Sequence, residues 1–218
     1  MSGVAVRTVG LTRRFGRRWA LRGLDLEVER GEVCAVLGAN GTGKTTLLRV
    51  LATLLGPTAG TVEVLGVDVE RGGDAIRRLA ALMTPTGHTY EELTGVENLR
   101  FAARMAGVPA DDGRLRGALD AVGLADAADE PSRAYSTGMR KRLELARMGL
   151  RPLELVLLDE PFTSLDETGV ELVQEAIAGW KASGATVLLA SHRVGDALRH
   201  ADRVVRLERG TVVPDGAA

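Results

Sequence analysis

The chain is poor in the residues on which several classes of protein depend. Its 218 residues include one cysteine, Cys34, so an intramolecular disulfide cannot form and a cysteine-rich zinc site is excluded. Aromatic residues make up only 3%, which leaves few rings for stacking along single-stranded nucleic acid. The core must therefore be built from aliphatic side chains, mainly Leu, Val, Ala and Ile.

An excess of one charge and long apolar runs are also missing. The 28 basic and 29 acidic residues give a formal net charge of −1, so no global basic field holds nucleic acid or an anionic membrane surface. The longest apolar stretches, such as 155–158 and 185–190, fall far short of the roughly 20 residues that span a bilayer. The start lacks the basic-then-apolar pattern of a secretion signal. We expect a soluble chain that meets a membrane only through a partner.

What is present is the pattern of an α/β protein. Hydrophobic residues make up 45% and charged residues 26%, as in ordinary globular proteins, and the length suits one domain. The sequence predicts strands at 4–11, 24–28, 32–37, 61–65, 155–158, 185–190, 204–207 and 211–213, and helices at 45–55, 97–105, 114–122, 170–182 and near 194–200. Strands that alternate with helices imply a sheet that is parallel at its centre. The helical middle is predicted as an insertion between the first and second central strands.

Residues 38–45 form a candidate phosphate-binding loop between a predicted strand and a predicted helix. They match the pattern G-x-x-x-x-G-K-S/T. The glycines let successive N–H groups point at phosphate oxygens, and the helix adds its positive N-terminal end. Lys44 would supply a compact charge to the phosphates, and the Thr45 hydroxyl can bind Mg²⁺. A plain glycine-rich turn is the alternative, which the flanking strand and helix disfavour.

The lysine in this loop is informative in itself. Of the 28 basic residues only Lys44, Lys141 and Lys181 are lysine, yet one of them stands at this position. The wide planar fork of arginine and the compact ammonium of lysine are not interchangeable, and a loop that closes over phosphates has room for the second only. Chance placement of one of three lysines is the alternative.

A second acidic motif lies at the end of the predicted strand 155–158. Asp159 can hold the hydration shell of Mg²⁺, and Glu160 can act as general base toward the attacking water. Neighbouring strand residues point to opposite faces, so the two carboxylates can reach different targets. Acidic residues that only cap a strand are the alternative. His192 follows the strand 185–190 and faces the ligand side of such a sheet, where it can hydrogen-bond the γ-phosphate and hold Glu160. A loop histidine without a role is its alternative, and His88 and His200 are assigned none.

Taken in order, these motifs resemble those of the nucleotide-binding subunit of ATP-binding-cassette (ABC) transporters, over nearly the whole chain. Residues 38–48 are similar to the family's Walker A motif, 155–160 to its Walker B motif with the catalytic glutamate, and 164–166 to its D-loop. His192 is similar to its switch histidine. The signature position, which separates this family from other P-loop proteins, is held by Tyr135, Ser136, Thr137, Gly138 and Met139.

The resemblance implies an α/β P-loop NTPase fold with a mostly parallel central sheet, an antiparallel β subdomain at the N-terminus and an inserted α-helical subdomain. One ABC ATPase domain would span 1–218, with a RecA-like core at about 1–85 and 151–218 and the helical subdomain at about 86–150. The implied cofactors are ATP and Mg²⁺. Phe15 falls where the family places an aromatic that stacks on adenine; a core aromatic is the alternative.

The site residues follow from the same resemblance. It assigns catalytic roles to Glu160, His192 and Lys44 and metal contacts to Thr45 and Asp159. It assigns nucleotide contacts to Phe15, Gly38, Ala39, Asn40, Gly41, Thr42, Gly43, Lys44, Thr45, Thr46, Ser136, Thr137, Gly138 and Met139. The last four would act across a homodimer that forms when ATP is bound.

The implied function is ATP hydrolysis that powers export through a separate integral membrane permease, with the chain peripheral on the inner face of the cell membrane. Haem export for cytochrome c maturation is one substrate that the motifs suggest; a drug, polysaccharide or lipid exporter fits nearly as well. A non-transport ABC ATPase on ribosomes or nucleic acid is the alternative, although no coiled coil or zinc module is present and no nucleic-acid partner is expected. A P-loop kinase would not carry the signature motif.

Two departures from the family pattern stand out. The signature reads Tyr-Ser-Thr-Gly-Met rather than Leu-Ser-Gly-Gly-Gln, but Ser136 and Gly138 keep the phosphate-contacting positions, and the variant resembles exporter subunits that serve short separate permeases. The family's Q-loop glutamine falls at Pro85, which has no side-chain oxygen and no N–H. Thr84 and Thr86 are the neighbours with a hydroxyl that could take its place.

Overall fold

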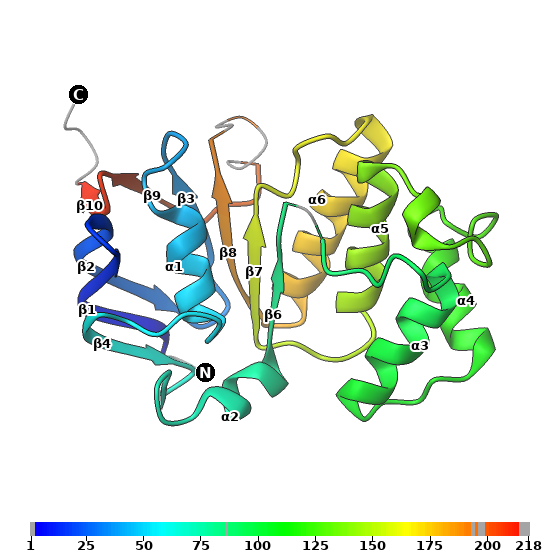
Figure 1. Cartoon of the computed structure of the whole chain (residues 1–218), viewed down its shortest axis with the longest axis horizontal. Helices are drawn as coiled ribbons and strands as arrows, with labels where there is room; N and C mark the ends of the chain where they lie inside the picture. The colour runs from blue at the N-terminus through cyan, green and yellow to red at the C-terminus, as the bar shows by residue number, and fades with distance from the viewer. Residues whose placement is uncertain (1–2, 86, 193–194, 196–198, 214–218) are drawn as a thin grey trace. The chain divides into compact units, whose positions relative to one another are not determined.

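The computed structural model of the chain describes residues 3–85, 87–192, 195 and 199–213. The chain divides into two compact units. The first consists of Met1–Leu82, Leu153–Glu160 and Ile177–Ala218, and the second of Met83–Pro152 and Pro161–Ala176. The first unit holds the sheets, and the second is mainly helical (Figure 1).

A mostly parallel sheet forms the centre of the first unit. Its strands among the described residues, in spatial order, are β10 (Thr211–Val213), β9 (Arg203–Glu208), β3 (Val33–Leu37), β8 (Thr186–Ser191), β7 (Leu155–Asp159) and β6 (Ala80–Met83). The pairs β9–β3, β3–β8 and β8–β7 are parallel, and β10 is antiparallel to β9. Strands β3, β7 and β8 are buried along their whole length, which explains why most of their residues are apolar. The prediction of a sheet that is parallel at its centre is confirmed.

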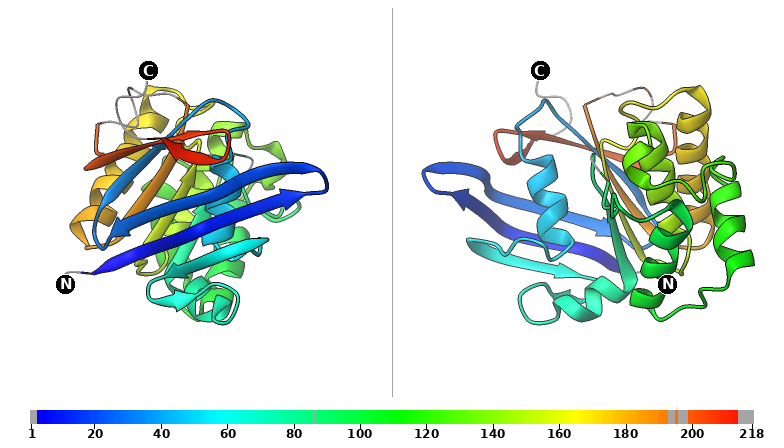
Figure 2. Two further views of the ribbon diagram at one scale, coloured as in Figure 1. Left: turned by 90° about the vertical axis from the view of Figure 1, so that its left-hand side faces the viewer. Right: turned by 45° about the vertical axis from the view of Figure 1, so that its right-hand side comes forward.

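A second, antiparallel sheet lies in the N-terminal part of the first unit. It contains β2 (Arg18–Glu29), β1 (Val4–Phe15), β4 (Ala59–Val64) and β5 (Val67–Asp68), in that order. Strands β1 and β2 form the long blue hairpin in Figure 2 and are joined by two residues, of which Gly16 has φ +57°. The sequence predicted only 4–11 and 24–28. Residues near the hairpin end are exposed on both faces, so the alternating pattern that marks a half-buried strand is lost there.

One aliphatic core joins the two sheets and helix α1 (Lys44–Leu51) in the first unit. Helix α1 packs against β7 and β8 and buries Leu47, Leu48 and Leu51 completely. The core also takes in Leu11 and Leu21 from the hairpin strands. Each fully buried leucine contributes about 1.5–3 kcal/mol relative to exposure, so this cluster fixes the helix that follows the candidate phosphate loop.

Three elements of the first unit were not predicted from the sequence: the two-residue strand β5, helix α2 and strand β6. Helix α2 (Gly73–Leu79) is short, and strand β6 follows it directly. Because β6 comes before the helical segment, the prediction that the insertion lies between the first two central strands is wrong: the insertion follows the second, β6. The sequence Ala-Ala-Leu-Met has no β-branched residue and only four positions, too few to show a strand pattern.

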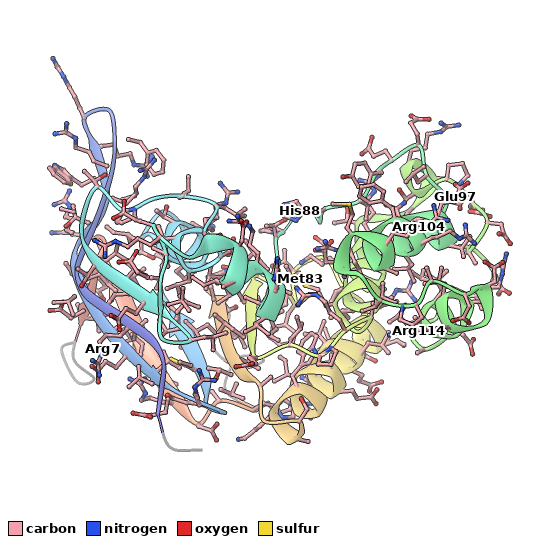
Figure 3. The ribbon with its side chains drawn as sticks, turned by 90° about the horizontal axis from the view of Figure 1, so that it is seen from below. Arg7, Met83, His88, Glu97, Arg104 and Arg114 are labelled. Carbon is pink, nitrogen blue, oxygen red and sulfur yellow. The ribbon has the colours of Figure 1, made fainter. Side chains whose placement is uncertain are left out.

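The second unit is built from helices α3 (Gly95–Ala106), α4 (Asp112–Asp120), the short η1 (Ser132–Ala134) and α5 (Thr137–Met148), and it contains the first ten residues of α6 (Glu167–Ala182). Helix α3 begins with a capping box in which Thr94 and Glu97 exchange hydrogen bonds, and it ends at Gly107, whose φ is +68°. Glu97 and Arg104 on α3 and Arg114 on α4 are labelled in Figure 3. The predicted helices at 97–105 and 114–122 are therefore present with shifted ends.

Most of the helix predicted near 194–200 lies outside the described residues. Within the described part of the chain, every helix is too short or too polar to cross a membrane.

Replacing Leu157 with alanine should lower the free energy of unfolding by about 2–5 kcal/mol, because this side chain of β7 is fully buried and its loss leaves a cavity. Urea unfolding measures the change. Leu54→Ala is the matched control, since that leucine is 54% exposed and should cost less than about 0.5 kcal/mol. Equal losses in the two variants would contradict the position of the core.

Candidate functional site

The loop from Gly38 to Gly43 joins β3 to α1 and is enclosed by neighbouring backbone. A Cβ atom on Gly38 would lie 2.4 Å from the Leu207 carbonyl oxygen, and one on Gly43 would lie 2.6 Å from the Ala20 carbonyl oxygen. Gly43 also has φ +114°, which side chains other than glycine rarely tolerate. The loop therefore needs glycine at both ends, for lack of space and for backbone conformation.

Lys44 lies inside the curl of this loop. Its ammonium donates hydrogen bonds to the carbonyl oxygens of Gly38 at 2.7 Å and Ala39 at 3.1 Å, and the side chain is only 5% exposed. The same Nζ lies 3.7 Å from Glu160 Oε1. A guanidinium would not fit among these acceptors, which agrees with the choice of lysine in an arginine-rich chain.

Asp159 ends β7 beside the first turn of α1, where it is almost completely buried. The Thr45 hydroxyl hydrogen-bonds its carboxyl group, while burial raises the pKa of Asp159 above its ordinary value. Its Oδ1 atom has no hydrogen-bond partner among the described residues. A buried carboxylate oxygen without a partner, next to a hydroxyl, fits a hard cation such as Mg²⁺. No group of three acidic, histidine or cysteine side chains suited to a metal occurs in the described parts of the chain, and Mg²⁺ commonly completes its shell with water and phosphate.

Glu160 is held in a strained conformation between two cationic or polar neighbours. Its φ is +49°, and its N–H donates to the Ala190 carbonyl at 2.9 Å. Its Oε2 atom lies 2.8 Å from His192 Nδ1, and it accepts longer bonds of 3.4 Å from the His192 N–H and the Ser191 hydroxyl. The carboxylate is thus fixed between Lys44 and His192, so the structure brings these three predicted residues together.

Phe15 lies at the end of strand β1 and is 45% exposed, so it is not a core residue. The guanidinium of Arg13 stacks over its ring at 4.8 Å. Phe15 pairs directly with Arg18 on β2, and Arg18 Nη2 lies 3.5 Å from where a Cβ on Gly41 would stand. Cross-strand partners share a face, so Phe15 is on the side of the hairpin that meets the phosphate loop. Stacking on adenine stays a prediction.

The signature residues lie in the second unit, where α5 begins. The Ser136 hydroxyl caps the helix by accepting the Met139 N–H at 3.2 Å, and Thr137 is the first helical residue. Tyr135, which replaces the family's leucine, is buried and donates its hydroxyl to the Ala127 carbonyl at 2.5 Å. A Cβ on Gly95 would lie 2.4 Å from this hydroxyl, so the tyrosine needs glycine there.

The segment at the Q-loop position belongs to the second unit. Thr84 is buried, its hydroxyl has no hydrogen-bond partner among the described residues, and its carbonyl accepts the Gly87 N–H. Thr86 lies outside the described residues. The part played by Thr84 in place of the family's glutamine stays a prediction.

Sequence reasoning missed a buried carboxylate on α5. Glu144 accepts the His88 N–H at 2.8 Å and forms an ion pair with Arg147. Burial raises its pKa, but hydrogen bonds from His88 and the charge of Arg147 outweigh burial and hold the pKa below its ordinary value. Figure 3 labels His88 on the segment that follows Met83. No sequence motif marks this pair, because the two residues are 56 positions apart.

A glycine loop around a buried lysine, between a parallel strand and a helix, with an acidic strand end beside it, defines a P-loop nucleotide-binding domain. The sequence family described as ABC transporter matches residues 21–163. The chain therefore belongs to the ABC transporter family and is an ATP-binding ATPase domain of it.

Known proteins agree with this assignment. The chain is 41% identical to a daunorubicin resistance ATP-binding protein of Streptomyces coeruleorubidus, over all of this chain and 70% of that protein. It is 40% identical to a cytochrome c biogenesis ATP-binding export protein of Cupriavidus necator, over 88% of this chain and 82% of that one. A solved ATP-binding subunit of an ABC transporter has a TM-score of 0.86 and 30% identity, covering 95% of this chain and 88% of that subunit. The chain spans 65% to 70% of the length of the daunorubicin resistance relatives.

Lys44→Ala should weaken ATP binding at least about tenfold, because it removes the one ammonium that lies inside the phosphate loop. Calorimetric titration with ATP measures the affinity. Lys181→Ala is the control, since Lys181 is exposed and pairs with Asp202. An unchanged ATP affinity in Lys44→Ala would remove the phosphate-loop assignment.

Asp159→Asn should stabilise the fold at neutral pH while lowering hydrolysis by about 100-fold, the equivalent of about 2.7 kcal/mol. Because the pKa of Asp159 is raised in the folded state, stability falls as pH rises from the ordinary aspartate pKa through the raised one. The asparagine removes this dependence. Urea midpoints should therefore be higher than wild type at pH 7 and converge with it in acid. A lower midpoint at pH 7 would contradict the raised pKa.

Proposed function

We propose that this chain is the ATP-hydrolysing subunit of an ABC exporter whose membrane-spanning permease is a separate chain. The observation that carries the proposal is the fixed Glu160 carboxylate, held 2.8 Å from His192 Nδ1 and 3.7 Å from Lys44 Nζ. A general base must be oriented by its neighbours before substrate arrives, and these contacts provide that orientation.

The described residues divide the chemistry among them. The N–H groups of the 38–45 loop and the Lys44 ammonium bind the phosphates of ATP. Thr45 and Asp159 would hold Mg²⁺, which when bound neutralises charge on the phosphates. Glu160 takes the proton of the attacking water, and His192 keeps the carboxylate of Glu160 in the orientation that accepts it.

We further propose that two copies of the chain pair when ATP is bound. Ser136, Thr137, Gly138 and Met139 would contact the γ-phosphate held by the other copy, with the N-terminal end of α5 directed at the anion. Hydrolysis removes that bridging phosphate and lets the dimer open, which the permease converts into transport. In this arrangement the whole of 1–218 acts as one ABC ATPase domain at the inner face of the membrane.

The names of relatives suggest candidate substrates for the proposed export. Matching proteins are named for daunorubicin resistance and for cytochrome c biogenesis export, and both cover most of this chain. We propose export of a hydrophobic or amphipathic compound, with haem as one candidate and a drug as the other. The near-neutral net charge disfavours the alternative of an ABC-family ATPase that acts on the ribosome or on nucleic acid.

Glu160→Gln should trap an ATP-bound dimer, because the amide cannot accept a proton while nucleotide binding is retained. Hydrolysis should fall by about 10²–10⁴-fold, the range that general-base catalysis supplies. Size-exclusion chromatography with and without ATP measures the dimer, and Lys44→Ala with Glu160→Gln in one chain provides the control that cannot bind ATP. A variant that binds ATP yet stays monomeric would sink the proposal of paired subunits.

A further inference from the structure

The second unit contains a buried lysine that the phosphate chemistry does not use. Lys141 lies in the second turn of α5 and is 1% exposed. Its Nζ donates a hydrogen bond of 2.7 Å to the Thr163 carbonyl and a longer one of 3.4 Å to the Pro161 carbonyl. Burying an ammonium is costly unless its donors are satisfied, and hydrogen bonds from a charged donor are stronger than those between neutral groups. These bonds therefore fix α5 firmly to the turn 161–163.

That turn stands between two functional segments of the chain. It begins one residue after Glu160 and leads directly into the D-loop, Ser164-Leu165-Asp166. Ser164 has φ +62°, a strained value for a residue other than glycine. Asp166 Oδ1 accepts the Gly169 N–H at 2.9 Å and so caps the start of α6. The position of the D-loop thus depends on the position of the turn 161–163, to which Lys141 is hydrogen-bonded.

The signature motif contacts the same segment one helical turn earlier. Gly138 and Lys141 are three residues apart, so they lie on one face of α5. A Cβ on Gly138 would lie 3.4 Å from the Ser164 carbonyl oxygen and 3.7 Å from Leu165. The first turn of α5 therefore packs closely on the D-loop, and the second turn is bonded to the residues before it.

The identity of the residue supports a specific requirement for an ammonium. Lys141 is flanked by Arg140 and Arg142, and 25 of the 28 basic residues are arginine, with lysine only at 44, 141 and 181. The neighbouring arginines reach carbonyl groups from more exposed positions: Arg142 reaches those of Val122 and Gly123. At 141 the site is closed, and a compact donor fits where a wide planar one does not.

We infer that Lys141 is a positioning residue for ATP hydrolysis. Its ammonium couples the signature helix to the turn 161–163, and through that turn to Glu160 on one side and to the D-loop on the other. The inference rests on the proposed function, because only in that function does the signature helix α5 contact the γ-phosphate of ATP. A γ-phosphate bound at the first turn of α5 would then act on the segment that adjoins the general base.

The test compares Lys141→Met with Lys181→Met. Methionine keeps most of the volume and removes the donors, and Lys181 is the exposed lysine that pairs with Asp202. Lys141→Met should lower kcat for ATP at least about tenfold while leaving ATP affinity unchanged. Amide hydrogen exchange at 164–169 should be at least about tenfold faster, with α3 (Gly95–Ala106) unchanged. Lys181→Met should behave as wild type in both measurements.

A purely structural role would give a different result. If loss of Lys141 only destabilises the unit, exchange would rise in α3 as well as in the D-loop, and this outcome overturns the inference. So does an unchanged kcat, or exchange at 164–169 equal to wild type. Lys141→Gln, which keeps a shorter donor, should give intermediate values and replaces the methionine variant if that one does not fold.

One measurement needs no variant. The side-chain ammonium signal of Lys141 in lysine labelled with ¹⁵N should exchange its protons with water more slowly than that of Lys181; equal rates overturn the inference. Failure of the proposed function is separate from failure here. A wild-type chain that neither hydrolyses ATP nor pairs would contradict the proposed function. The exchange comparisons are made without ATP, so they test only the positioning role of Lys141.

Discussion

The ion pair of Lys44 and Glu160 is the interaction around which the nucleotide site is arranged. The ammonium draws the carbonyl groups of Gly38 and Ala39 inward, which sets the curl of the loop, and it lies 3.7 Å from the carboxylate at the end of the acidic strand. Strand β8 lies between β3 and β7, and it contributes Ser191 and the neighbouring His192 to the other side of that carboxylate. Three adjacent strands thus end at one cluster of charges, and the aliphatic core beneath them keeps those ends in register.

The parts of this arrangement that are local in sequence could be predicted from it. The strands β3, β7 and β8 are short, mostly apolar runs, and the phosphate loop is a contiguous motif. What could not be predicted depends on contacts between distant positions. The hydrogen bond from the His88 N–H to Glu144 joins residues 56 positions apart, and no motif or spacing in the sequence marks it. Strand β6 and the outer half of the β1–β2 hairpin were missed because their residues lack the alternation that burial on one face imposes.

The second unit shows why a motif can change while its geometry persists. The signature begins with Tyr135 instead of leucine, and the larger ring is accommodated because residue 95 is glycine and residue 127 offers a carbonyl to the hydroxyl. Ser136 still caps α5, so the N-terminal end of this helix keeps its capping hydrogen bond. A comparison of motif letters alone would count the tyrosine as a loss, whereas its packing shows a compensated replacement.

The scarcity of lysine has a practical consequence for handling the protein. Two of the three lysines are almost completely buried, and the third, Lys181 near the end of α6, has a side chain that is 42% exposed. A reagent that acylates amines would therefore find one ready side chain among the described residues. A dye, a surface or a crosslinker attached through a lysine side chain would therefore be attached at Lys181, without any engineered cysteine.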